Sequence, residues 1–95
     1  MNPVRTLLMV YVYVLKSSKD GKWYTGLTEN LSQRIREHNE GKVFSTKLRR
    51  PLVLIYYEAC LSKSDAKRRE RYLKTGIGKR YLKNRLKNTL EVLTR

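Results

Sequence analysis

The feature that most constrains the fold of this chain is a short apolar run near its N-terminus. Residues 8–15 read LMVYVYVL and contain no charge, glycine or proline. Valine and tyrosine both favour strands, and an unbroken apolar run is typical of a strand that is covered on both faces. We therefore expect residues 8–15 to form the central strand of a sheet.

A hairpin is expected directly after this strand. Residues 17–21 (SSKDG) supply turn-forming side chains, and the Asp-Gly pair can adopt the positive φ angles that a tight hairpin needs. Residues 23–27 then form the returning strand. Because the connection is so short, the two strands should be antiparallel.

Capping residues and apolar runs predict the remaining elements. Asn30 can cap a helix that runs to about Glu40, where Gly41 ends it. A basic loop over residues 42–51 leads to a third apolar strand over residues 52–59.

The second half of the chain is expected to be helical. Ser62 or Ser64 can cap a second helix that runs through Lys74 and is ended by Gly76, and a third, basic helix covers residues 79–87. The order β-β-α-β-α-α predicts an α+β fold, a three-stranded antiparallel or mixed sheet with flanking helices. A chain of 95 residues suits a single domain; we expect it over residues 8–88, with a C-terminal tail over residues 89–95.

The charge balance indicates the class of partner. The chain has 22 lysines and arginines against 8 acids, a formal net charge of +14. Such an excess favours a polyanion, because each neutralised phosphate releases condensed counterions. We expect a nucleic acid, DNA rather than RNA, and no feature calls for a membrane or an obligate protein partner.

Two other interpretations of the sequence are weaker. The segment Met1–Leu15 combines Arg5 with an apolar run, as a secretion signal does, but it lacks a small-residue cleavage site and its apolar part is too short to span a bilayer. The single Cys60 fits a reducing, cytoplasmic setting and cannot form an internal disulfide or a zinc site. Cys60 and His38 are a conceivable nucleophilic pair, although a cysteine directly after an apolar run more commonly packs as a small hydrophobe.

Helical phase places several reactive side chains toward the apolar side of their helices. On the first helix, Leu31 and Ile35 define an apolar stripe, and Arg34 and His38 lie along it. On the second helix, the apolar residues Ala66, Leu73 and Ile77 mark the inward side. Glu70 lies four residues after Ala66 and three before Leu73, so it is expected to point inward as well.

An inward carboxylate needs a cation, because burying it alone costs several kcal/mol. That cation can be an arginine, a lysine or a metal ion. The simplest alternative is that Glu70 pairs with Arg34 or with a lysine on its own helix, Lys67 or Lys74. Taken singly, none of these side chains identifies a site.

Their order and spacing, however, match a known pattern. Tyr11-Val12-Tyr13 is followed eleven residues on by Tyr24-Thr25-Gly26, and the arginine, histidine and glutamate come later, as Arg34, His38 and Glu70. This arrangement over about residues 9–75 resembles the GIY-YIG nucleases. It looks closest to their small stand-alone bacterial members, which resemble the nuclease domain of a DNA-repair excinuclease.

Two residues depart from the family pattern, since Tyr11 replaces a glycine and Thr25 replaces an isoleucine. Neither change removes a side chain to which the family's chemistry is assigned. A late asparagine contributes in some members, and both Asn84 and Asn88 fit that role.

The resemblance implies a metal-dependent endonuclease. Glu70 would hold one divalent ion, Mg²⁺ or Mn²⁺, which keeps most of its waters and therefore suits a single carboxylate. Arg34 would grip a phosphate oxygen. Tyr13 would take the proton from the attacking water, a role that requires nearby positive charge to lower its pKa. Tyr24 would orient water or phosphate, with His38 as a secondary candidate for that task.

The resemblance and the charge together indicate further roles. Gly26 is expected to serve packing and close backbone approach. Residues 63–87 hold 11 basic residues and two acids, so they are expected to contact the nucleic-acid backbone together with the loop before the third strand. The predicted binding residues are Lys47, Arg49, Arg50, Lys67, Arg71, Lys74, Lys79, Arg80 and Lys83.

The sequence contains no motif for base recognition, so any substrate preference should come from nucleic-acid shape. Two other functional classes remain as alternatives. One is a non-catalytic, basic nucleic-acid-binding module, and the other is a basic protein-interaction domain on a ribonucleoprotein.

Overall fold

A computed structural model describes residues 8–94 as a three-stranded sheet between two helical layers. Residues 1–7 and Arg95 lie outside the described residues. Residues 1–7 include most of the part that was compared with a secretion signal before the apolar run, and Arg95 ends the expected tail. The strands are β1 (Val10–Ser17), β2 (Trp23–Thr28) and β3 (Leu52–Cys60); the helices are α1 (Leu31–Asn39), the short 3-10 turn η2 (Lys47–Arg49), α2 (Lys63–Lys74), α3 (Gly76–Arg85) and α4 (Lys87–Leu93).

The sheet has the order β2-β1-β3, and both pairings are antiparallel. The predictions of an α+β fold and of a central first strand are therefore confirmed. The strand begins at Val10 rather than Leu8 because Val10 pairs with Cys60, the last residue of β3, and Leu8 is 77% exposed.

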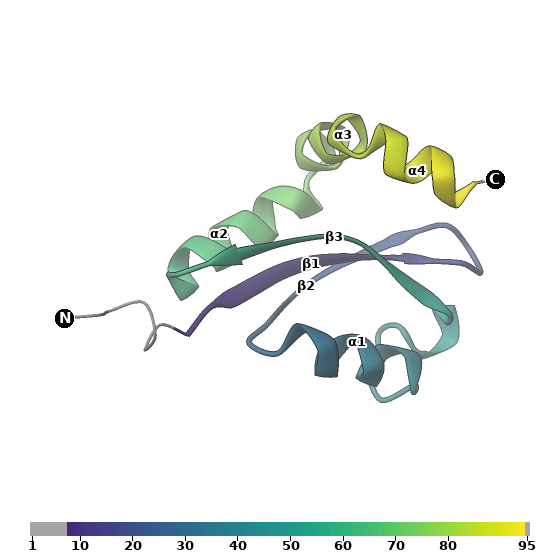
Figure 1. The fold of residues 1–95 in the computed structure, drawn as a ribbon, viewed down its shortest axis with the longest axis horizontal. Helices are drawn as coiled ribbons and strands as arrows, with labels where there is room; N and C mark the ends of the chain where they lie inside the picture. The colour runs from purple at the N-terminus through teal and green to yellow at the C-terminus, as the bar shows by residue number, and fades with distance from the viewer. Residues whose placement is uncertain (1–7, 95) are drawn as a thin grey trace.

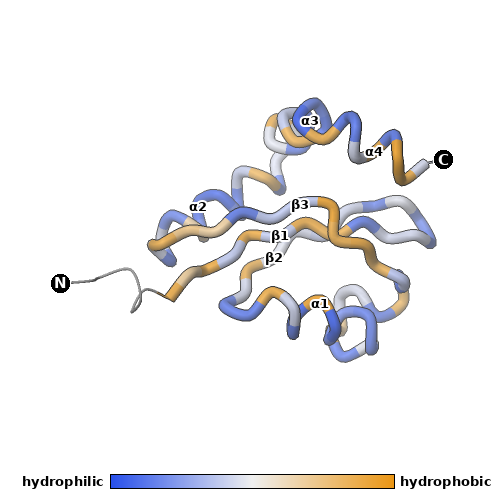
Figure 2. The backbone as a smooth tube through the Cα atoms, in the orientation of Figure 1, coloured by the Kyte–Doolittle hydropathy of each residue, from blue (hydrophilic) through white to orange (hydrophobic). Residues whose placement is uncertain are grey.

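The two faces of β1 serve different helical layers (Figure 1). Its valines lie on the face covered by α2, α3 and α4, while Tyr13 and Leu15 lie on the face covered by α1. Figure 2 shows hydrophobic residues along much of the strands and also at intervals on the helices, while the turns are mostly hydrophilic. The expectation that the first strand is covered on both faces is thus correct.

Side-chain caps set the ends of the helices. Asn30 accepts a hydrogen bond from the backbone N–H of Gln33 at the start of α1, and Gly41 after it has a φ of 80°, as expected for a helix stop. Ser62 caps α2 in the same way.

The junction after α2 differs from the expectation. Thr75 ends α2 and also caps α3, because its hydroxyl accepts a hydrogen bond from the N–H of Gly78. Gly76 is therefore the first residue of α3 and not the stop of α2. The break changes the helical phase, so Ile77, expected to face inward, is 64% exposed while Gly78 is buried.

The expected tail contains a further helix, α4, whose Leu90 packs against the core. The helix was missed because it is only one to two turns long and mostly exposed. Within residues 8–94, no helix has the length and apolar character needed to cross a membrane.

Candidate active site

Tyr13 occupies the middle of the central strand and is almost completely buried on the α1 face. Its partner across the strand pair is Gly26 of β2. A Cβ atom on Gly26 would lie 2.6 Å from the Tyr13 hydroxyl oxygen. The missing side chain therefore allows the phenol to lie directly against β2.

The Tyr13 hydroxyl is joined to α1 through His38. Its Oη lies 2.8 Å from His38 Nε2, and His38 Nδ1 lies 2.7 Å from Thr46 Oγ1. All three side chains are buried. Thr46 was missed by sequence reasoning, since it is one threonine in a basic loop and no motif marks it.

His38 is neutral in this setting. Burial, reinforced by the nearby Arg34 charge, lowers the pKa of His38 to about 4. A neutral imidazole has one N–H, so the chain of hydrogen bonds has two orientations. Either Tyr13 donates to Nε2 while Nδ1 donates to Thr46, or Thr46 donates to Nδ1 while Nε2 donates to Tyr13.

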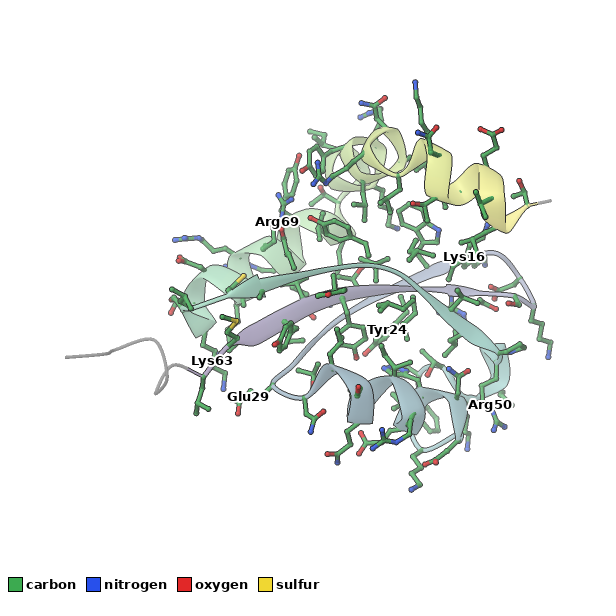
Figure 3. All side chains as sticks on the ribbon, viewed as in Figure 1. Lys16, Tyr24, Glu29, Arg50, Lys63 and Arg69 are labelled. Carbon is green, nitrogen blue, oxygen red and sulfur yellow. The ribbon has the colours of Figure 1, made fainter. Side chains whose placement is uncertain are left out.

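Tyr24 completes an aromatic cluster with these groups. Its ring centre lies 5.0 Å from that of His38 and 6.3 Å from that of Tyr13, and Figure 3 shows it between the sheet and α1. Cys60 packs instead with the core of the opposite face. Because both nitrogens of His38 already have partners, the conceivable Cys60–His38 pair does not form.

Arg34 lies one helical turn before His38 and beside the phenol. Its Nη1 pairs with Glu37 at 3.0 Å, and the side chain remains about one third exposed. Burial raises the pKa of Tyr13 above its ordinary value, although the Arg34 guanidinium acts in the opposite direction. Arg34 alone therefore does not lower the pKa of Tyr13 as the proposed base role requires.

Glu70 lies on α2, the helix on the other face of the sheet. Burial is the main cause that raises the pKa of Tyr13, and the negative charge of Glu70 adds a smaller contribution. Among the pairings considered from the sequence, the one that forms is with Lys74, at 3.2 Å. The Glu70 side chain is 21% exposed and thus partly accessible to solvent.

A hydrated divalent ion fits this donor set. Within residues 8–94, no three side chains of histidine, cysteine, aspartate or glutamate come together to form a metal cage. A single, partly exposed carboxylate suits Mg²⁺ or Mn²⁺, which retain waters and accept substrate phosphate as a ligand. It does not suit zinc, which takes three or four protein ligands.

The predicted binding residues are divided between several elements. Lys67, Arg71 and Lys74 surround Glu70 in the sequence of α2 and are exposed, whereas the late asparagines lie on α3 and α4, on the face of the sheet opposite Tyr13. The loop arginines are already engaged within the protein: Arg49 pairs with Asp20 and Arg50 donates to the carbonyl of Lys47.

Comparison with known proteins identifies the class. Residues 9–87 match the family described as the GIY-YIG catalytic domain, and the chain belongs to this family. It is similar to the UPF0213 protein SH2523 of Staphylococcus haemolyticus, with 53% identity over 66 residues, 68% of this chain and 79% of that protein. It is also similar to the UPF0213 protein SSP2268 of Staphylococcus saprophyticus, with 42% identity over 74 residues, 77% of this chain and 89% of that protein.

The fold has a solved counterpart. The solution NMR structure of the UPF0213 protein BH0048 from Bacillus halodurans is similar with a TM-score of 0.50 and 39% identity. The similarity covers 78% of this chain and 81% of that chain.

Proposed function

We propose that this protein is a metal-dependent endonuclease that hydrolyses phosphodiester bonds of DNA. The observation that carries the proposal is the buried hydrogen bond between Tyr13 and His38, with Arg34 beside the same phenol. Membership of the GIY-YIG family supports it.

His38 is the group best placed to remove the proton from Tyr13. A phenol with a raised pKa is a poor base at neutral pH, so it needs an acceptor for its own proton. His38 Nε2 lies 2.8 Å away, and in one orientation of the network its lone pair faces the phenol while Nδ1 donates to Thr46. Tyr13 then takes a proton from the attacking water as its own moves to His38. Because the pKa of His38 is about 4 without a ligand, this transfer requires the negative charge of the bound phosphate to stabilise the imidazolium.

Arg34 and Tyr24 are proposed to position the phosphate. The exposed part of the Arg34 guanidinium offers a planar fork to two phosphate oxygens, and its contact with Glu37 fixes its direction. The Tyr24 hydroxyl would orient the water or the phosphate by a hydrogen bond.

Glu70 is proposed to hold the metal ion, Mg²⁺ or Mn²⁺. When bound, the ion would supply charge neutralisation at the phosphate and stabilise the leaving oxygen. Glu70 would then no longer pair with Lys74. Lys74 would then contact the DNA backbone together with its exposed neighbours Lys67 and Arg71.

Plasmid nicking in Mg²⁺ or Mn²⁺ tests the proposal. We expect the wild-type protein to nick DNA, and Arg34→Ala and Glu70→Ala to lose at least about 100-fold in rate, as is usual for the loss of a charge that stabilises the transition state. Arg36→Ala is the matched control, because Arg36 is exposed on the same helix as Arg34.

Two results would refute the proposal: no cleavage of any DNA by the wild type, or cleavage by both variants at the wild-type rate. Salt-sensitive binding that is unchanged by Glu70→Gln, without any metal-dependent product, would instead identify a non-catalytic nucleic-acid-binding module. RNA substrates in the same assay check the choice of DNA.

A further inference from the structure

A second group of charged residues gathers at the start of β2, away from the candidate active site. Here the β1–β2 turn, the end of η2 and one side of α3 form a hollow at the surface. Its lining is made of four basic residues, one glycine and one tryptophan: Gly21, Lys22, Trp23, Arg49, Lys79 and Lys83.

Arg49 is held in place at this hollow by the hairpin. The buried hydroxyl of Ser17 donates to the Arg49 carbonyl at 2.6 Å, and Arg49 Nε donates to Asp20 at 3.3 Å. Its Nη2 is buried without a hydrogen-bond partner in the described part of the chain. A guanidinium nitrogen of this kind is costly, and an anionic ligand reached by a small rotation of the guanidinium would satisfy it.

The three lysines of the hollow have no counter-charge of their own. Lys22, Lys79 and Lys83 form no ion pair within residues 8–94. Asp20, in the adjacent β1–β2 turn, is already engaged by Arg49 and by the backbone N–H of Lys22. The lining holds four cations and no acid, which leaves a concave, positively charged surface that fits phosphate groups.

The hollow and the candidate active site lie on opposite faces of the sheet. Trp23 packs with the core beneath α2, α3 and α4, and Lys79 and Lys83 lie on α3, whereas Tyr13 and Tyr24 lie on the α1 face. The hollow is therefore separate from the candidate active site.

We infer that this hollow binds backbone phosphates of the DNA at a place separate from the cleaved bond. The inference rests on the proposed function for the identity of the ligand, while the binding itself needs no cleavage. The hollow would anchor the DNA without reading any base.

The salt dependence of DNA binding tests the inference directly. Binding of a fluorescent 20-base-pair duplex is measured in EDTA, so that no cleavage occurs, over a series of salt concentrations. We expect Lys79→Gln/Lys83→Gln to reduce the slope of log affinity against log salt by about 1.8, which is about 0.9 for each phosphate that the variant no longer neutralises. Both lysines are exposed, and circular dichroism confirms that the variant is folded.

A matched control removes two charges elsewhere. Arg36→Gln/Lys42→Gln changes two cations at α1 and just after it that do not line the hollow. We expect this control to change the slope by less than half as much. Equal changes in both variants, or none in the hollow variant, would overturn the inference.

Trp23 gives a second, local readout, because it is the single tryptophan of the chain. Its emission should change when the unlabelled duplex binds the wild type, and the change should be lost in Lys79→Gln/Lys83→Gln even at DNA concentrations that saturate the variant. An emission change that persists undiminished in the saturated variant counts against the hollow.

The two proposals fail separately. If the wild type cuts no DNA in Mg²⁺ but the slope difference is found, the nuclease proposal fails and the hollow stands as a DNA-binding site. If the wild type cuts DNA and the slope difference is missing, only the hollow fails.

Discussion

The hydrogen-bonded pair of Tyr13 and His38 joins two residues that lie 25 positions apart in the sequence. Helical phase indicated that Arg34 and His38 lie on the apolar side of α1, and the structure agrees, since His38 is fully buried and Arg34 partly so. The phase could not reveal the partner of the imidazole. That partner depends on how α1 packs on the sheet, and on a loop that brings Thr46 to the other ring nitrogen.

His38 should titrate far below an ordinary histidine. Because it is the single histidine of the chain, its Cε1–H resonance can be followed by NMR without assignment of other histidines. We expect a midpoint at about pH 4, caused by burial and by the Arg34 charge. A midpoint near pH 6.5 would show that the imidazole is solvated and that the buried network is wrong.

The same pKa shift predicts a pH dependence of stability. The folded pKa of His38 is below its unfolded value of 6.5, so the unfolded chain binds the proton more readily. The stabilisation from neutral His38 should be complete above pH 6.5 and be lost as the pH falls toward 4, by about 3 kcal/mol at most. Urea unfolding at several pH values measures it, and His38→Gln should remove this component between about pH 6.5 and 5. If the free energy of unfolding of His38→Gln depends on pH as steeply as that of the wild type, the assignment of this component to His38 is contradicted.

Gly26 should tolerate no larger side chain. In Gly26→Ala the new Cβ would lie 2.6 Å from Tyr13 Oη, so either the phenol or the strand must move. We expect a loss of about 1–3 kcal/mol in the free energy of unfolding, the usual cost of overpacking, and displacement of Tyr13 from His38. Thermal unfolding measures the first effect.

Gly76→Ala is the matched control for this substitution. A Cβ at Gly76 meets no atom within 4 Å, and the residue lies at the start of α3. It should be neutral or slightly stabilising. Equal destabilisation by the two substitutions would contradict the account of Gly26.

At the scale of elements, α2 is fixed to its neighbours by Arg69, on the side of the sheet away from α1 (Figure 3). Its guanidinium pairs with Glu58 of β3 and lies over the rings of Tyr72 and Tyr81, 5.4 Å and 5.1 Å from their centres. Arg69 thus connects β3, α2 and α3. Since it directly precedes Glu70, this contact also sets where the proposed metal ligand lies.

Arg69→Ala should lower the free energy of unfolding by about 1–3 kcal/mol. This is less than for a fully buried pair, because both side chains retain more than a quarter of their exposure. Arg68→Ala removes the neighbouring arginine, whose pair with Asp65 is mostly exposed, and should cost less than about 1 kcal/mol. Chemical denaturation compares the two. If Arg68→Ala is as damaging as Arg69→Ala, the connecting role assigned to Arg69 is wrong.

The elements that the sequence predicted well are those defined by local signals. The cap at Asn30, the glycine stop at Gly41 and the apolar strands all appear where expected, within about two residues. Besides the short helix α4, the main error occurred at the junction of α2 and α3, where one residue belongs to the ends of both helices. Thr75 ends one helix and starts the next, which a helix-stop signal at Gly76 concealed.

At the scale of the whole molecule, the net charge is +14, and lysines and arginines lie on the helices of both layers. The sequence indicated which residues are basic, but the hollow at β2 depends on the meeting of α3 with a distant hairpin and could not be predicted. If about six cations contact phosphates, the logarithm of the affinity for duplex DNA should fall with the logarithm of the salt concentration at a slope of about −5. A slope near zero would show that the charge is not used for DNA.

The central claim is that Tyr13 acts through its hydroxyl at a phosphodiester-cleaving site. The most direct test is the single-turnover rate of DNA cleavage in Mg²⁺ by Tyr13→Phe, at protein concentrations that saturate the DNA. The phenylalanine keeps the ring that packs against Gly26 and removes only the hydroxyl bound to His38. Tyr81, which is exposed on α3 across the sheet from Tyr13, is changed to phenylalanine as the control. We predict a rate at least about 100-fold below wild type for Tyr13→Phe, as for the loss of a general base, and an unchanged rate for Tyr81→Phe. Cleavage by Tyr13→Phe within about threefold of the wild-type rate would contradict the account.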